Sequence, residues 1–242
     1  MYNLQGKTAL VTGAAGGIGR AIVAALRAQG VTVAGADIHG CDADHAFTGD
    51  LMDAAFCDGL IARAHAAMGG LDILVNNAGI ITRGKITEAT DDDYARSMAI
   101  NVEAPFRLCR AAIPVMAAAG QGAIVNVASC WGVHPGPNHP IYVMSKAAVA
   151  SLTQCLGIDH AHQNIRVNAV CPNEVNTPMI RTGFATRGLD PDRAIDELNA
   201  SVPLGRIAEP EDIADVVTYL VSDQARYLCG VLIEANGGKS VQ

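Results

Sequence analysis

The sequence has no Cys-x-x-Cys pair, no basic patch with interleaved aromatics, and no uninterrupted apolar run near the ~18 residues of a membrane-spanning helix. The first absence, with an odd and dispersed set of seven cysteines, argues against a disulfide framework and indicates the reduced thiols of a cytoplasmic protein. The second, with a formal net charge of −7, argues against nucleic-acid binding. The third gives no reason to expect a membrane partner.

Two further features are missing. The seven histidines show no ligand spacing with cysteine or acidic residues, so we expect no metal site. Residues 1–7 lead directly into an apolar stretch, which leaves no room for a signal peptide and again favours the cytoplasm. Half of the 242 residues are apolar, and chains of this length commonly form one α/β domain. We therefore expect a single domain over residues 1–242.

Short apolar stretches alternate with longer helical segments. This alternation predicts an α/β fold with one parallel, doubly wound, seven-stranded sheet of the Rossmann kind. The expected strands are residues 8–12, 31–37, 45–48, 71–75, 122–128, 165–171 and 231–234. Helices are expected over residues 20–29 and 53–68, over a long segment that starts after Thr90 and is kinked or ended at Pro114, around Tyr142, and from Pro210. The connection over residues 38–44 is too short for a crossover helix.

A glycine-rich turn follows the first strand. Residues 13–19 read Gly-Ala-Ala-Gly-Gly-Ile-Gly and lead into a helix, a context in which the backbone can approach a pyrophosphate; an ordinary βα turn is the alternative. Asp37 ends the second strand, where a carboxylate accepts hydrogen bonds from ribose hydroxyls and repels a 2′-phosphate, unless it only closes an Asx-turn. Because no Arg or Lys occurs at residues 14–16 or directly after Asp37, we expect NAD rather than NADP.

Tyr142 and Lys146 are four residues apart and share one face of a helix. Free tyrosine has a pKa of about 10, and a cation within ~4–6 Å lowers such a pKa by roughly 1–3 units. Alone, the pair would equally fit a half-buried tyrosine beside a solvated lysine. Ser129 stands at the end of the 122–128 strand, and Asn101 lies inside a helix, where a buried amide needs a backbone partner or a water.

In this order and combination, the elements resemble the compact single-domain branch of the short-chain dehydrogenase/reductase family over nearly the whole chain. Residues 12–19 fit its Thr-Gly-x-x-x-Gly-x-Gly turn, residues 76–79 its Asn-Asn-Ala-Gly element and residues 142–146 its Tyr-x-x-x-Lys pair. Ser129 precedes Tyr142 by 13 residues, the spacing of the family's catalytic serine. Asn101 matches the helix asparagine of its catalytic tetrad.

The resemblance implies hydride transfer between a nicotinamide and the carbinol or carbonyl carbon of a small-molecule substrate, by a homotetramer. Tyr142 would be the general acid/base, Ser129 would hydrogen-bond the substrate oxygen, Lys146 would hold the ribose hydroxyls and lower the Tyr142 pKa, and Asn101 would anchor a relay water. The residues expected to bind NAD are Gly13, Gly17, Ile18, Gly19, Asp37, Asp50, Leu51, Asn77, Ala78, Gly79, Tyr142, Lys146, Pro172, Val175 and Thr177.

The substrate stays open. A secondary alcohol is favoured, with sugars and polyols as candidates; the alternatives are a 3-oxoacyl-thioester reductase and a sensor that binds NAD without turnover. Residues 177–203 are polar and interrupted by Gly and Pro, which predicts a mobile lid over the substrate. The family has a glycine after the proline that ends its sixth strand, and here Asn173 replaces it. Further candidates for the substrate pocket are Arg83, Trp131, His134, His139, Glu174, Met179 and Arg181.

Overall fold

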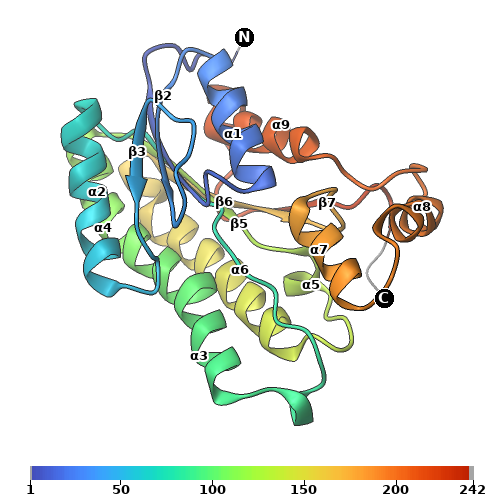
Figure 1. Cartoon of the computed structure of the whole chain (residues 1–242). Coiled ribbons are helices and arrows are strands. Elements are labelled where there is room, and N and C mark those ends of the chain that lie inside the picture. The colour runs from blue at the N-terminus through green and yellow to red at the C-terminus, as the bar shows by residue number, and fades with distance from the viewer. Residues whose placement is uncertain (1, 240–242) are drawn as a thin grey trace.

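The computed structural model describes residues 2–239, and its centre is one sheet of seven parallel strands in the order β3-β2-β1-β4-β5-β6-β7 (Figure 1). The strands are β1 (Thr8–Thr12), β2 (Thr32–Asp37), β3 (His45–Thr48), β4 (Ile73–Asn76), β5 (Gly122–Val127), β6 (Ile165–Pro172) and β7 (Leu232–Ala235). The predicted α/β class and seven-stranded parallel sheet are therefore confirmed. The third strand is short and follows a helix-free connection, as expected.

The strand order reverses between β1 and β4. The chain builds outward from β1 to β3, then returns to the other side of β1 and builds outward from β4 to β7. This is the predicted doubly wound arrangement. In such sheets, ligands bind beyond the carboxyl ends of the strands at the point of reversal. That point lies beside the glycine-rich turn after β1 and the Asn-Asn-Ala-Gly turn after β4.

Helices cover both faces of the sheet, which explains why its strands are almost continuously apolar. On one face α1 packs against α9; α2, α4 and α6 lie on the other (Figure 1). Val11 belongs to the core on the α1 side, and its neighbour Leu10 belongs to the core on the opposite side. The α-helices are α1 (Gly17–Ala28), α2 (Ala54–Met68), α3 (Asp91–Met98), α4 (Ala104–Ala119), α5 (Cys130–Val133), α6 (Pro140–His160), α7 (Pro178–Thr186), α8 (Pro191–Ser201) and α9 (Pro210–Val221).

The long helix after Thr90 is not interrupted where the sequence suggests. Helix α4 continues through Pro114, and the interruption is a π-helical turn at Ala99–Glu103 that joins α3 to α4. Pro114 is exposed, so the carbonyl of Arg110 that loses an N–H partner can face water at little cost. The π-helical turn instead contains the buried Asn101.

Two segments without a predicted helix contain helices. Helix α5 begins directly after Ser129, whose Oγ accepts a hydrogen bond from the Trp131 amide at 3.1 Å. Residues 177–203 form α7 and α8, with Pro178 and Pro191 in their first turns. Proline in the first turn of a helix sacrifices no intrahelical hydrogen bond, so these prolines start helices rather than interrupt them.

The sequence predicts no segment that is long and apolar enough to span a membrane, but helix α6 meets this criterion. With the short turn after it, residues 140–163 are long and apolar enough to cross a membrane by length and composition alone, with a mean hydropathy of 1.3. The helix packs against β6 and α5, and Ser145, Lys146 and Thr153 point into this buried side. Packing on the sheet accounts for part of its apolar character, and Met144 and Ile158 on this helix are exposed.

Candidate active site

The glycine-rich turn brings backbone to the switch point of the sheet. Gly13 has a positive φ of 65°, and a Cβ at Gly19 would overlap the carbonyl oxygen of Gly13, so neither position tolerates a side chain. Gly16 occupies the N-cap of α1 and has no side chain to accept from the first N–H groups of the helix. These N–H groups and the positive end of the helix dipole suit a pyrophosphate.

The turn after β4 is tied to the glycine-rich turn. Thr12 Oγ1 accepts hydrogen bonds from the backbone amides of Asn77 and Ala78, each at 3.1 Å, and Asn77 Nδ2 donates to the Thr12 carbonyl at 2.9 Å. Asn76 points away from this region and donates to Asn126 Oδ1 at 2.8 Å in the core. Of the two asparagines, Asn77 therefore shapes the site, whereas Asn76 connects β4 to β5.

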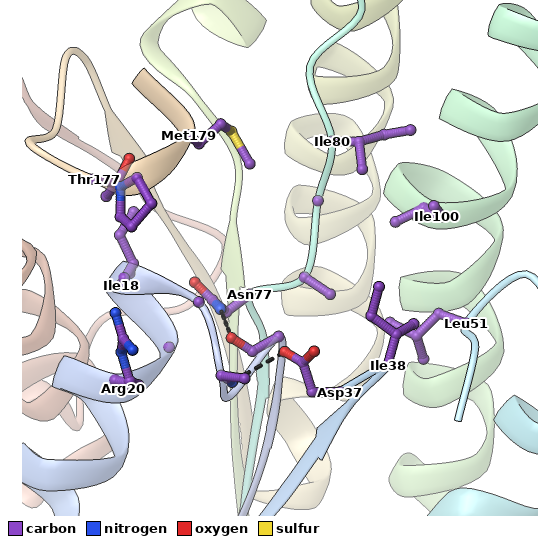
Figure 2. Close-up of a pocket in the computed structure, with 18 of the residues that line it drawn as sticks. Ile18, Arg20, Asp37, Ile38, Leu51, Asn77, Ile80, Ile100, Thr177 and Met179 are labelled. Carbon is purple, nitrogen blue, oxygen red and sulfur yellow. Dashed lines mark hydrogen bonds between the residues drawn. The ribbon is translucent and has the colours of Figure 1, made fainter. Parts of the chain in front are cut away.

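Asp37 lies at the same edge of the sheet (Figure 2). Its carboxylate accepts from the Ala15 amide at 3.0 Å and, in an Asx-turn, from the His39 amide at 3.0 Å. The Asx-turn is therefore present, and ribose binding stays a prediction, for which each carboxylate oxygen keeps a second acceptor position. The bond to Ala15 also fixes the carboxylate against the glycine-rich turn.

These elements enclose a cavity of about 460 Å³. Ile38, Leu51 and Ile100 lie on one side of it near Asp37, and Ile18 and Thr177 lie across from them (Figure 2). The predicted NAD-binding residues that line this cavity are Gly13, Gly17, Ile18, Gly19, Asp37, Asp50, Leu51, Asn77, Ala78, Gly79 and Thr177. Glycine backbone, a helix N-terminus, a carboxylate and an apolar slot together fit a nicotinamide dinucleotide.

Sequence reasoning missed several residues of this cavity. Ile38 and Ile100 complete the apolar side, and Arg20 and Met179 also line the wall. Ile38 directly follows Asp37 and could have been found from that position. Ile100 could not, because its place depends on the π-helical turn that joins α3 to α4.

A second cavity of about 350 Å³ adjoins the first and shares Ile18, Asn77, Gly79 and Thr177 with it. Ser129, Tyr142 and Lys146 line it, and so do Pro172 and Val175, the remaining residues predicted to bind the cofactor. Of the further pocket candidates, it is lined by Arg83, Trp131, His139, Glu174 and Met179. Two candidates are engaged elsewhere: His134 pairs with Glu234 at 3.0 Å, and Arg181 pairs with Asp192 at 2.7 Å.

Tyr142 is supported by Trp131, whose ring meets it edge-on with centroids 6.5 Å apart. Burial raises the pKa of Tyr142 above its ordinary value, whereas the Ser129 side chain and the Arg83 charge lower it. Lys146 Nζ lies 6.0 Å from the centre of the tyrosine ring. Burial outweighs the lowering contributions, so the Tyr142 pKa is raised in this structure, and the role of Lys146 in lowering it stays a prediction.

Lys146 is nearly inaccessible, and its Nζ donates to the Val127 carbonyl at 2.8 Å. Burial lowers the pKa of Lys146 to about 8. Gly79 allows this position, because a Cβ there would lie 3.1 Å from Lys146 Nζ and 3.3 Å from Asn101 Oδ1. The ammonium group thus lies where the dinucleotide cavity meets the Tyr142 cavity.

Asn101 is 1% exposed and its amide is bonded to protein groups. Oδ1 accepts from the Ile80 amide at 2.9 Å, and Nδ2 donates to the Ile80 carbonyl at 2.9 Å and to Ser145 Oγ at 3.0 Å. The expected backbone partner is therefore confirmed, and the relay water stays a prediction. Asn101 fixes the loop after β4 against α6.

Comparisons with known proteins agree with this geometry. Residues 13–240 match the family model described as enoyl-(acyl carrier protein) reductase. The oxidoreductase UcpA of Escherichia coli K12 is 33% identical over all of this chain and 97% of its own. The 2,5-dichloro-2,5-cyclohexadiene-1,4-diol dehydrogenase of Sphingobium indicum UT26 is 38% identical over 98% of each chain, and 4-formylbenzenesulfonate dehydrogenase of Comamonas testosteroni is 35% identical over 99% of this chain and 100% of its own.

Solved structures share the whole fold. Aldohexose dehydrogenase of Thermoplasma acidophilum superposes with a TM-score of 0.94 at 31% identity, over 100% of this chain and 96% of its own. 3-Ketoacyl-(acyl-carrier-protein) reductase of Brucella melitensis, complexed with NADH, superposes with a TM-score of 0.90 at 30% identity over 99% of this chain and 100% of its own. With matches across its full length and a dinucleotide cavity that opens onto Ser129, Tyr142 and Lys146, the chain belongs to the short-chain dehydrogenase/reductase family of oxidoreductases.

Proposed function

We propose that the protein is an NAD-dependent dehydrogenase of secondary alcohols, with sugars and polyols as leading candidates. The observation that carries this proposal is the junction of the two cavities. Tyr142 and Ser129 line one of them, and it opens onto the other, whose glycine-rich wall suits a dinucleotide. A secondary alcohol placed at this junction can reach a proton acceptor and a cofactor together.

In alcohol oxidation, Tyr142 as phenolate takes the hydroxyl proton of the substrate. The Ser129 hydroxyl donates to the substrate oxygen as negative charge develops on it. Lys146 and Asn101 act around this pair: the ammonium group holds ribose hydroxyls, and Asn101 positions the backbone beside them. When bound, NAD supplies the hydride acceptor, which is chemistry that the protein itself does not provide.

NAD is proposed over NADP because Asp37 faces the dinucleotide cavity with a full negative charge. A 2′-phosphate at the adenosine ribose would meet this carboxylate at close range. The similar Brucella reductase was solved with NADH, which supports a nicotinamide cofactor of this kind. Arg20 also lines the cavity, but it follows Gly19 on α1, where it accompanies the pyrophosphate turn rather than the ribose end.

The names of similar proteins support an alcohol or diol substrate. They include an aldohexose dehydrogenase and a cyclohexadienediol dehydrogenase. The second candidate function, reduction of a 3-oxoacyl thioester, is favoured by the description of the matching family model and by the ketoacyl reductase of similar structure. Both candidates use the same catalytic residues and differ in what the second cavity holds.

The test is a spectrophotometric screen for NADH. The purified protein is offered NAD with a panel of sugars, polyols, cyclic diols and simple secondary alcohols, and NADH with ketones and an acetoacetyl thioester. We expect NADH formation with at least one class of secondary alcohol. Turnover of the thioester alone would favour the second candidate. Nicotinamide binding without turnover of any member would contradict the enzymatic proposal and favour an NAD sensor.

A further inference from the structure

Two arginines meet on the wall of the Tyr142 cavity. Arg83 lies in the loop after β4, and Arg187 follows the last residue of α7. Both contact Gly183: the Arg83 guanidinium occupies the space that a Cβ at Gly183 would fill, and Arg187 Nε donates to the Gly183 carbonyl at 3.0 Å. Gly183 thus brings together two cations from segments that are far apart in sequence.

The position of Arg83 is fixed by its neighbours. The Gly84 amide donates to the Asn138 carbonyl at 2.8 Å, and the Thr82 and Ser97 hydroxyls are hydrogen-bonded to each other. These contacts hold the loop after β4 against the segment before α6 and against α3. Arg83 therefore projects from an anchored backbone toward α7.

Within residues 2–239, neither arginine forms an ion pair with an acidic side chain. The acid that lines this cavity, Glu174, is bonded to Lys239 at 2.6 Å. His139 and Tyr142 are titratable neighbours of these arginines. Burial, and then the charges of Arg83 and Arg187, lower the pKa of His139 and so favour the neutral ring. In a chain of net charge −7, this wall carries two adjacent positive charges without a counter-charge.

Resting on the proposed function, we propose that the substrate carries an anionic oxygen-bearing group remote from its reacting carbinol, and that Arg83 and Arg187 bind this group. Carboxylate, sulfonate and phosphate share the required chemistry: planar guanidinium groups donate paired hydrogen bonds to such oxygens. An anion there would offset the repulsion between the two arginines. It would also connect the loop after β4 to α7, and so couple substrate binding to the position of the predicted lid.

The kinetic test compares alcohols with and without an anionic group. 3-Hydroxybutyrate and 4-hydroxycyclohexanecarboxylate are each measured beside their amides, and glycerol 3-phosphate beside glycerol. The measured quantity is the kcat/KM ratio of the charged over the neutral member, because this ratio cancels any change in the Tyr142 pKa common to both. We expect the wild type to favour the charged member of at least one pair by roughly 10–100-fold, typical of hydrogen bonds to charged groups. The pair that responds distinguishes a carboxylate from a phosphate substrate.

Four variants test the assignment. Arg83→Met and Arg187→Met should each lower the ratio about tenfold or more, and Arg83→Lys should restore part of it. Gly183→Ala should also lower the ratio, although both arginines remain, because the new methyl group displaces the Arg83 guanidinium. Arg181→Met is the matched control, because Arg181 lies on α7 like Gly183 but pairs with Asp192. The kcat/KM ratio of this variant should equal that of the wild type.

Calorimetric binding of the same acids and amides, with and without NADH, gives a readout that needs no turnover. Selective binding of an acid that is lost in Arg83→Met supports this proposal even if no alcohol is oxidised, in which case the proposed dehydrogenase function fails instead. Turnover or binding of acids and amides with equal efficiency overturns the anion proposal while the dehydrogenase function stands. Failure of every acid to bind at millimolar concentration also overturns it.

Discussion

The amino group of Lys146 lies in a position that is almost inaccessible to solvent. The side chain is 5% exposed, and burial lowers its pKa from 10.5 to about 8. Burial of the charged amino group therefore destabilises the folded state relative to the unfolded chain, in which water solvates the charge. Such a group is expected where activity, rather than stability, determines the residue.

Lys146→Met should consequently raise the free energy of unfolding at neutral pH. Removal of the buried charge should contribute up to about 3 kcal/mol, and loss of the hydrogen bond to Val127 should offset part of this gain. The substitution should also weaken NAD binding. Because the folded-state pKa lies below the unfolded value, the wild type should gain stability as pH rises from about 8 toward 10.5, and the variant should lack this gain. Urea denaturation at neutral and alkaline pH measures both effects, with exposed Lys85→Met as control. A variant less stable than the wild type would contradict this account.

Asp37 makes the cofactor preference testable at one side chain. Asp37→Asn removes the charge that repels a 2′-phosphate and keeps one oxygen, which can replace the acceptor of either the Ala15 amide or the His39 amide, because these amides bond to different carboxylate oxygens. The kcat/KM with NAD divided by the kcat/KM with NADP should fall by about tenfold or more. Asp37→Ala should lower this ratio further and also weaken the glycine-rich turn. Steady-state kinetics with both cofactors checks this. A wild type that prefers NADP would refute the NAD assignment.

At the residue scale, short sequence patterns predicted the positions that local geometry determines. Gly13 and Gly19 are needed where backbone approaches backbone, and Tyr142 and Lys146 share a helical face, so spacing alone placed them. The meeting of Arg83 with Arg187 depends on how α7 packs against the loop after β4, which spacing does not contain. The same is true of the bond from Lys146 Nζ to the Val127 carbonyl.

Among the elements, α7 and α8 form a small unit of their own. Phe184, Ala194, Ile195 and Val202 pack together with Ile207 in a cluster separate from the two main cores. A unit with its own small core can move relative to the sheet without opening the rest of the protein. This arrangement is compatible with the lid predicted for residues 177–203.

Hydrogen exchange can test the lid. Amides of α7 and α8 should exchange faster than those of β1 and β4 in the free protein, and they should become protected when NADH and a substrate analogue bind together. The amides of α9 serve as the internal reference. Equal protection of α7 and α8 with and without ligands would count against a lid.

Sequence rules at the element scale succeeded for strands and only partly at prolines. Buried parallel strands are apolar on both faces, which makes their runs easy to recognise. Pro210 starts α9 as predicted. Pro114, expected to kink or end a helix, lies on the exposed side of α4, which continues through it, and Pro191, expected to interrupt a segment, begins α8. The cost of a proline depends on whether its carbonyl partner is buried and on its place in the helix, and both follow from tertiary structure.

For the whole molecule, we propose a homotetramer. Helices α4 and α6 carry exposed large apolar side chains: Phe106 is 46% exposed, Met144 45% and Ile158 78%. Small residues along both helices permit close packing against another copy. Sedimentation equilibrium at micromolar concentration should give four times the 25.1 kDa of one chain. Phe106→Glu with Ile158→Glu should yield smaller species, because burying the new charges would be costly. A stable wild-type monomer would refute the proposal.

The central claim is that Tyr142 exchanges the substrate proton at the junction of the two cavities. The most direct test measures kcat for NADH formation by wild type and Tyr142→Phe, with the best alcohol found in the screen. The variant keeps the ring packed against Trp131 and lacks the hydroxyl, so it should fold and bind NADH like the wild type. Its kcat should fall by at least ~10²–10⁴-fold, and the wild-type rate should rise with pH as Tyr142 deprotonates. A folded Tyr142→Phe protein that oxidises the alcohol at close to the wild-type rate would contradict the account.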